Sequence, residues 1–297
     1  MRAILALFVF LSLAFGQSEL ELAVFAEANA ARERAGLRPL AFYPELYQAA
    51  RAHALDMLRR GYFGHEGPGG PSLFERLWQA GVYELKVAEN LYEIAGPYLP
   101  ADLPKRAVEG WLNSPGHRQN LLDPEFTHGA VAVVGEGGRY VVVQEYAYRP
   151  FPLAVSREAG KGEVLWVSLS GRAKTAGGLV YGGYFLYQFS PGEVAFEAAL
   201  PADAEVELYY DAGGYYQAAR CPEDCSRLGL SFARERRVLP GYSLFLRPPF
   251  GRYTLAFGDE PRFLGEKTLP DRLFAPRVWR FLWLGQGGSL THRVPLF

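Results

Sequence analysis

The feature that most constrains the fold is a change of pattern at Arg149-Pro150-Phe151-Pro152. Before this segment, apolar residues recur at helical spacing between capping signals. After it, short apolar runs alternate with Gly, Pro and Asp. A chain of 297 residues is long enough for two domains. The pattern predicts an α+β domain over 17–149, followed by an all-β, sandwich-like domain over 150–297.

Residues 1–16 have the three parts of a secretory signal peptide. Arg2 supplies the positive start, an apolar stretch runs from Ala3 to Phe15, and the small residue Gly16 precedes the expected cleavage site at Gln17. The stretch is shorter than the roughly 20 residues that span a bilayer. We therefore expect cleavage and a secreted, extracytoplasmic protein without a transmembrane segment, a retained anchor being the alternative.

Capping signals predict five helices before residue 123. Two should follow the capping boxes that begin at Ser18 and Ser72, and one should begin at Pro44. The others should follow Asp102 and Ser114, and both side chains are predicted to cap a helix. Three of these helices should end at a glycine, the residue suited to the left-handed position: Gly36, Gly61 and Gly81.

A β-hairpin signal follows the helices. Residues 130–134 and 140–143 are apolar runs on either side of Gly135-Glu136-Gly137-Gly138. Both strands are apolar on both faces, so each face of their sheet needs a cover. Helices on the two faces would supply it.

Composition excludes several classes of protein. Hydrophobic residues make up 49% and charged residues 21%, which fits a globular core and not a disordered chain. The formal charge of −1 gives no electrostatic footprint for nucleic acid. Two cysteines exclude a disulfide-rich scaffold and a four-thiolate zinc site. In an oxidising compartment we expect a disulfide between Cys221 and Cys225, the alternative being free thiols.

Four of the five histidines lie in the first domain: His53, His65, His117 and His128. His53 is on the apolar stripe of its helix, so we expect it to be buried and structural. His65 lies in the glycine-rich segment 61–68, where packing explains a histidine less easily. His117 falls in the first turn of a short helix, where the helix dipole favours a neutral imidazole suited to a ligand or a base.

Glu89 follows the apolar pair Val87-Ala88. An acid in an apolar stretch usually has a partner, and that partner can be purely structural. Spacing alone leaves open whether His65, Glu89 and His117 meet in space. No Gly-x-Ser-x-Gly elbow, P-loop or dinucleotide fingerprint occurs.

Several motifs occur in order through the first domain: Gly36-Leu37-Arg38-Pro39-Leu40, Phe63-Gly64-His65, Ala88-Glu89-Asn90-Leu91, Gly110-Trp111-Leu112-Asn113-Ser114-Pro115-Gly116-His117-Arg118, and Gln144. Together they resemble the CAP superfamily of cysteine-rich secretory proteins, antigen 5 and pathogenesis-related proteins, also called SCP-like, in its bacterial branch. The resemblance runs from about 20 to 148. It implies a CAP-type α-β-α sandwich and a secreted protein, and it implies nothing about 150–297.

Members of this family carry a cleft with two histidines and two glutamates. By position, His65 and His117 match the histidines and Glu89 matches one glutamate. The register of the other glutamate, three residues after Trp111, holds Ser114. The resemblance therefore implies an incomplete tetrad, with His65, Glu89 and His117 as metal ligands and as candidate catalytic residues. Two histidines and one glutamate with an open water position make a workable site for Zn²⁺ or another divalent ion.

Three functions follow from these observations. The favoured one is a secreted binding module, in which the cleft holds a small apolar molecule such as a lipid, or a divalent metal, and the β domain docks to a cell-envelope or matrix component. The second is a metal-dependent, protease-like hydrolase at the cell envelope, with Glu89 polarising a water. The third is a structural envelope protein. No nucleic-acid partner is expected.

Overall fold

The computed structural model of the protein describes residues 17–96, 101–247, 251–268 and 272–297. The expected signal peptide, 1–16, lies outside the described residues. The chain divides into two compact units, and it passes from one to the other between Pro150 and Phe151. Within the described ranges, no helix is both long and apolar enough to cross a membrane.

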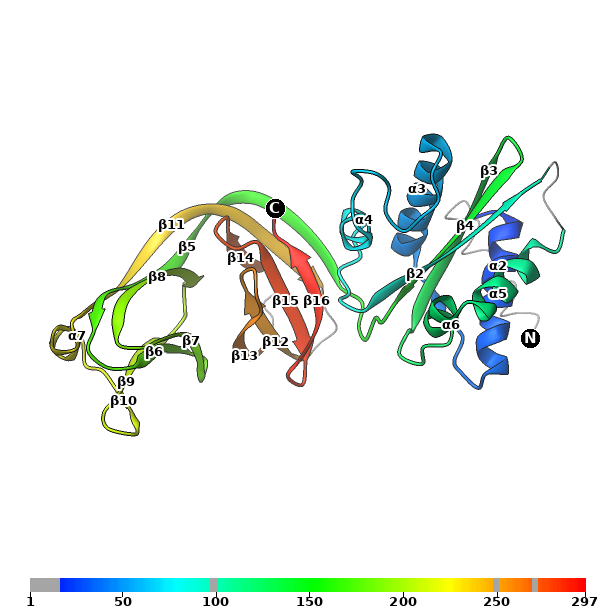
Figure 1. Ribbon diagram of the computed structural model, residues 1–297. Coiled ribbons are helices and arrows are strands. Elements are labelled where there is room, and N and C mark those ends of the chain that lie inside the picture. The colour runs from blue at the N-terminus through cyan, green and yellow to red at the C-terminus, as the bar shows by residue number, and fades with distance from the viewer. Residues whose placement is uncertain (1–16, 97–100, 248–250, 269–271) are drawn as a thin grey trace. The chain divides into compact units, whose positions relative to one another are not determined.

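A four-stranded sheet forms the centre of the first unit (Figure 1). Its order is β1 (Ala41–Phe42), β3 (His128–Glu136), β4 (Arg139–Ala147) and β2 (Val87–Ala95). Strands β3 and β4 form the predicted antiparallel hairpin. They turn at Gly137 and Gly138, whose φ angles are +61° and +80°. Positive φ at both turn residues matches the twist of hairpin strands and favours glycine.

Helices cover both faces of this sheet (Figure 1). Helices α3 (Pro44–Arg60) and α4 (Leu73–Gln79) pack on one face, and α2 (Glu19–Arg34), α5 (Leu103–Asn113) and α6 (Pro115–Leu121) pack on the other. Successive residues of a strand point to opposite faces. Val141 and Val143 of β4 accordingly join the first core, whereas Val142 joins the second. The unit is the α-β-α sandwich expected from the sequence.

Local capping chemistry sets most of the helix ends. Ser18 and Ser72 form complete capping boxes with Glu21 and Glu75, as predicted. Gly61 ends α3 in the left-handed conformation, with φ +70°. These ends satisfy backbone groups that a helix otherwise leaves without partners.

Two predicted side-chain caps are wrong. Asp102 and Ser114 occupy the N-cap positions of α5 and α6, but neither side chain makes a capping hydrogen bond. Asp102 has φ −94° and ψ 15°, which is not the extended conformation from which a side chain caps a helix. Its carboxylate pairs instead with Arg106, with 2.9 Å between Oδ1 and Nε.

The second unit departs from the predicted series of short strands. Strands β5 (Ala154–Ala173) and β11 (Leu230–Arg247) have 20 and 18 residues, and they pair antiparallel from end to end of β11. Figure 1 shows the pair as a long curved ribbon. The charged run Arg234–Arg237, which is largely exposed, lies in the middle of β11. The sequence there indicates the end of a strand, although the backbone stays paired.

The remaining strands complete three sheets of the second unit. Their orders are β14-β11-β5-β8, β10-β9-β6-β7 and β13-β12-β15-β16. The elements are β6 (Gly177–Tyr181), β7 (Tyr184–Phe189), β8 (Gly192–Pro201), β9 (Val206–Asp211), β10 (Tyr216–Ala218), α7 (Glu223–Leu228), β12 (Arg252–Phe257), β13 (Arg262–Thr268), β14 (Arg272–Pro276), β15 (Phe281–Gln286) and β16 (Ser289–Pro295). The predicted disulfide joins Cys221 to Cys225 at the start of α7, with the Cα atoms 5.1 Å apart.

Candidate functional site

Glu89 of β2 is the centre of a cluster of ionisable side chains in the first unit. The residue is only 3% exposed. Its Oε1 lies 2.8 Å from Nδ1 of His65, and its Oε2 lies 2.8 Å from Nη2 of Arg76 and 3.7 Å from Nε2 of His53. Burial alone would raise the pKa of Glu89, but the hydrogen bond from His65 and the charge of Arg76 hold it below its ordinary value. Glu89 is therefore ionised at neutral pH.

A second buried acid, Glu145, lies directly opposite Glu89 in the pairing of β2 with β4, on the same face of the sheet. Neither of its carboxyl oxygens has a hydrogen-bond donor among the described residues. Burial and then the charge of Glu89 raise the pKa of Glu145 well above its ordinary value. A protonated Glu145 can donate to Glu89, so the two carboxyl groups share one proton. Sequence reasoning missed this pair, because only the register of β2 with β4 brings the two acids together.

Arg76 of α4 fixes the loop that carries His65. Its Nη1 donates to the backbone oxygen of His65 at 2.8 Å and to that of Pro71 at 3.3 Å, while Nη2 pairs with Glu89. One guanidinium thus holds both the backbone of His65 and the acid that its ring contacts. Nothing in the sequence distinguishes Arg76 from other helical arginines, because its role depends on long-range contacts.

One ring nitrogen of His65 is hydrogen-bonded, and the other has no hydrogen-bond partner among the described residues. The Glu89 carboxylate can only accept, so Nδ1 of His65 carries the proton of the 2.8 Å hydrogen bond. This hydrogen bond raises the pKa of His65, although partial burial opposes the effect. The side chain is 55% exposed. A histidine held at Nδ1 by a carboxylate presents Nε2 in a fixed orientation, as metal-binding and general-base histidines do.

Asn90, the next residue of β2, points to the opposite face and positions the second histidine. Its Nδ2 donates to the backbone oxygen of His117 at 2.9 Å. Asn120, also on α6, donates to Oδ1 of Asn90 at 3.1 Å and to the backbone oxygen of Glu89 at 3.3 Å. Adjacent residues of one strand therefore hold the loop of His65 and the helix of His117.

The structure brings the rings of His65 and His117 together, with their centroids 6.3 Å apart. Burial and then the charge of His65 lower the pKa of His117, so this first-turn histidine is neutral, as predicted. His53 is buried, as predicted, and burial lowers its pKa. His128 packs against the ring of Tyr43, with 5.9 Å between centroids, and does not contact these side chains.

Comparison with known proteins identifies the segment that carries this cluster. The model of the cysteine-rich secretory protein family, CAP, matches residues 25–146. These residues form a CAP domain. His65, Glu89 and His117 all lie within the matched segment, and so do Arg76 and Glu145.

Two relatives come from Bacillus subtilis (strain 168) and are named as uncharacterized. YkwD is 36% identical over 109 residues, which cover 37% of this chain and 40% of YkwD. The membrane protein YlbC is 37% identical over 105 residues, which cover 35% of this chain and 29% of YlbC. The similarity to the CAP domain thus spans less than half of the length of either relative.

Solved structures also resemble the chain. An extracellular protein containing an SCP domain from Bacillus anthracis str. Ames is 31% identical with a TM-score of 0.36, covering 42% of this chain and 39% of that chain. An outer surface protein from Borrelia burgdorferi is 17% identical with a TM-score of 0.39, covering 45% of this chain and 96% of that chain.

A divalent metal is the cofactor that the sequence predicts for the CAP domain. In the described part of the chain, no group of three or more His, Cys, Asp or Glu side chains is arranged to hold a metal ion. Each oxygen of Glu89 accepts one hydrogen bond, from His65 and from Arg76, and these bonds fix the orientation of its carboxylate. His65 and His117 can still coordinate an ion, and Glu89 fits the carboxylate behind a ligating histidine.

A pocket of about 480 Å³ lies next to this cluster in the CAP domain. Residues of α3, of α4 and of the loop between them line it, including His53, Asp56, Tyr62, Arg76 and Gln79. His53 and Arg76 thus contact Glu89 and also line the pocket. A small molecule in this pocket would therefore contact two of the side chains that surround the Glu89 carboxylate.

Proposed function

We propose that the protein is an extracytoplasmic binding module whose CAP domain presents His65 and His117 to a divalent cation such as Zn²⁺. The 2.8 Å hydrogen bond from His65 to Glu89 supports this most strongly. It leaves Nε2 of His65 available and raises the basicity of that nitrogen. His117 supplies a second imidazole that is neutral at physiological pH. In this proposal Glu89 is a positioning residue and not a ligand.

A site of two imidazoles completed by water should bind metal weakly and exchangeably, in contrast to a closed four-ligand site. A bound divalent ion would act as a Lewis acid toward an oxygen of the ligand or of water. The export signal over 1–16 supports the extracytoplasmic location. The pocket between α3 and α4 offers a place for the small apolar molecule that the sequence also predicts, and the second unit would dock to the envelope or matrix.

A hydrolase is the second candidate, and the pairing of His65 with Glu89 favours it. A histidine oriented by a carboxylate is suited to act as a general base. Within the described residues, no Ser, Thr or Cys side chain hydrogen-bonds to His65, so water would have to be the nucleophile. Hydrolysis of a peptide or ester by wild type, lost in His65→Ala, would favour this candidate over simple binding.

Calorimetric titration of Zn²⁺ tests the binding site. We expect wild type to bind one ion, and His65→Ala and His117→Ala to lose the binding while keeping wild-type circular dichroism. His128→Ala is the matched control, because it removes a histidine of the same domain that does not contact the cluster. Equal zinc affinity in wild type and His117→Ala would show that these histidines do not form a metal site.

A further inference from the structure

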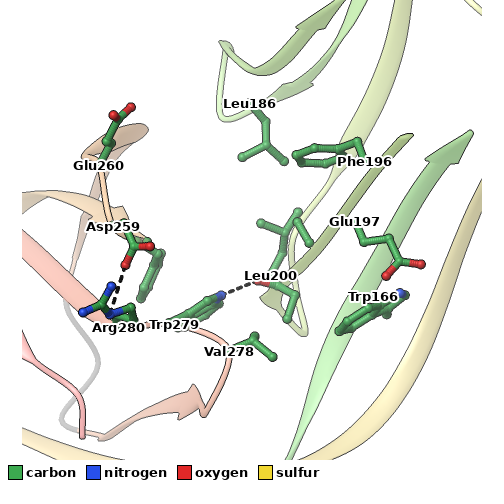
Figure 2. Close-up of a pocket in the computed structure, with 14 residues that line it drawn as sticks. Trp166, Leu186, Phe196, Glu197, Leu200, Asp259, Glu260, Val278, Trp279 and Arg280 are labelled. Atoms are coloured by element: carbon green, nitrogen blue, oxygen red, sulfur yellow. Dashed lines mark hydrogen bonds and ion pairs between the residues drawn. The ribbon is translucent and has the colours of Figure 1, made fainter. Parts of the chain in front are cut away.

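The second unit contains a pocket of about 570 Å³ that the proposed metal site does not use (Figure 2). Strand β8 forms one wall, at the edge of its sheet, together with Trp166 of β5 and Leu186 of β7. Residues 257–260 and 278–280, next to β12 and β15, form the other wall. The volume lies within the range of about 300–1,000 Å³ that is typical of small-molecule sites.

Aromatic rings form much of the wall: Trp166, Phe196, Phe257 and Trp279. The ring centroids of Trp279 and Phe257 lie 3.9 Å apart. The indole N–H of Trp279 donates to the backbone oxygen of Ala199 (Figure 2). These rings are thus fixed before any ligand arrives, which reduces the entropy lost on binding. The guanidinium of Arg237 lies 4.7 Å from the ring centroid of Trp166, so one face of that ring already holds a cation.

The charged residues of the pocket are mostly acidic. The lining contains three acids, Glu197, Asp259 and Glu260, and one base, Arg280. Arg280 is 3.5 Å from Asp259, so that pair is close to neutral. Glu197 and Glu260 have no cationic partner within the described ranges. Negative charge in excess and aromatic ring faces both attract cations, the first by Coulomb attraction and the second through the ring quadrupole.

The lining also argues against other ligands. None of its residues is Ser, Thr, Asn, Gln, Tyr or His. The wall therefore offers a polar, uncharged ligand no hydroxyl or amide side chain. The excess of carboxylates would repel a fatty acid or another anion. The carboxylates of the wall would attract a cation, and the aromatic rings would pack against its apolar stem.

We propose that this pocket binds an organic cation, that is, an ammonium or guanidinium group on an apolar stem. The cation can be a free amine or a basic side chain of a polypeptide, because the two present the same chemistry. The carboxylates of the pocket are exposed, so their contribution should weaken as salt screens it.

Calorimetry with the full mature protein tests this proposal. The probes are hexyltrimethylammonium, neutral 1-hexanol of the same chain length, and a pentalysine peptide. We expect the ammonium probe to bind at least about tenfold tighter than hexanol at low salt and to lose this advantage at about 0.5 M NaCl. Tighter binding of pentalysine than of the ammonium probe would identify a polypeptide as the source, and the reverse order would identify a free amine.

Two exposed carboxylates provide the decisive variant. Glu197→Gln/Glu260→Gln keeps the shape of the side chains and removes their charge, so we expect about tenfold weaker binding of hexyltrimethylammonium. Glu193→Gln is the matched control, since Glu193 is exposed on the same strand and lies outside the pocket. The proposal is overturned if the double variant binds as tightly as the control, if hexanol matches the ammonium probe, or if neither cation binds.

Discussion

Glu89 and Glu145 lie opposite each other inside the CAP domain, one ionised and the other protonated. His65 and Arg76 stabilise the charge of Glu89, whereas Glu145 loses its solvent on folding and gains no donor among the described residues. In the unfolded chain Glu145 would titrate near its ordinary pKa of about 4.3. Its folded pKa is higher, so the folded state holds a proton that the unfolded state releases as pH rises.

Glu145→Gln should therefore stabilise the protein increasingly as pH rises above about 4.3, up to the folded pKa of Glu145. Glutamine mimics the protonated acid and does not ionise. The stability of wild type relative to the variant should fall by up to about 1.4 kcal/mol per pH unit in that interval. Urea unfolding of both proteins across this range measures the difference.

The exposed Glu136→Gln provides the control, because it removes a carboxylate of the same sheet that is open to solvent. Its stability should run parallel to that of wild type at all pH values. A pH-independent difference between Glu145→Gln and wild type would mean that Glu145 is ionised in the folded protein.

At the scale of elements, two serines at the N-termini of helices differ in their hydrogen bonding. Ser18 closes a capping box with Glu21, whose carboxylate also accepts a hydrogen bond from the backbone N–H of Val133 in β3 at 3.0 Å. This cap therefore joins the start of α2 to the sheet. Ser114 occupies the same position in α6 without a side-chain cap.

Ser18→Ala should lower the free energy of unfolding by about 1 kcal/mol, the usual effect of losing an N-cap. Ser114→Ala should change it by less than about 0.5 kcal/mol, because no cap hydrogen bond is lost. Thermal or urea unfolding of the two variants compares them directly. Equal destabilisation would show that the two hydroxyl groups act alike in solution.

Signals that act within a few residues predicted the first unit well. Capping boxes, glycines after helices and the Gly137-Gly138 turn depend on neighbouring residues, and the structure confirms them. The sequence pattern did not predict the length of β5 and β11. A paired strand can carry exposed charges such as Arg234–Arg237 and still keep its hydrogen bonds.

The candidate site was predictable only in part. The family motifs pointed to His65, Glu89 and His117, which the structure brings together. The sequence did not predict Arg76 or Glu145, because the role of each depends on residues distant in the chain. Arg76 binds the loop at His65, and the register of β2 with β4 places Glu145 opposite Glu89. A single sequence contains no local sign of such contacts. The metal itself stays a prediction.

At the scale of the molecule, the CAP domain contains its own cores. Both clusters of buried side chains are made from residues between 24 and 147. Arg149 also belongs to this unit, because its guanidinium lies 3.9 Å from the ring centroid of Tyr43 and 3.5 Å from Glu84. A fragment cut after Pro150 keeps all of these contacts.

The fragment 17–150 should therefore unfold in a single cooperative transition. A shorter fragment, 17–138, lacks β4 and should not fold, because β4 lies between β2 and β3 in the sheet. Calorimetry or circular dichroism during heating compares the two. Gradual loss of signal in 17–150 would mean that the CAP domain needs the second unit.

The ribbon of β5 and β11 also implies an order of assembly. Gly171 and Leu230, paired at one end, are closer along the chain than Ala154 and Arg247, paired at the other. Closing the shorter loop loses less chain entropy, so pairing should start at the Gly171 end and proceed toward Ala154. The residues that follow Pro150 would then be the last of the ribbon to pair. Because the chain is synthesised from its N-terminus, the CAP domain would have time to fold before this end of the ribbon pairs.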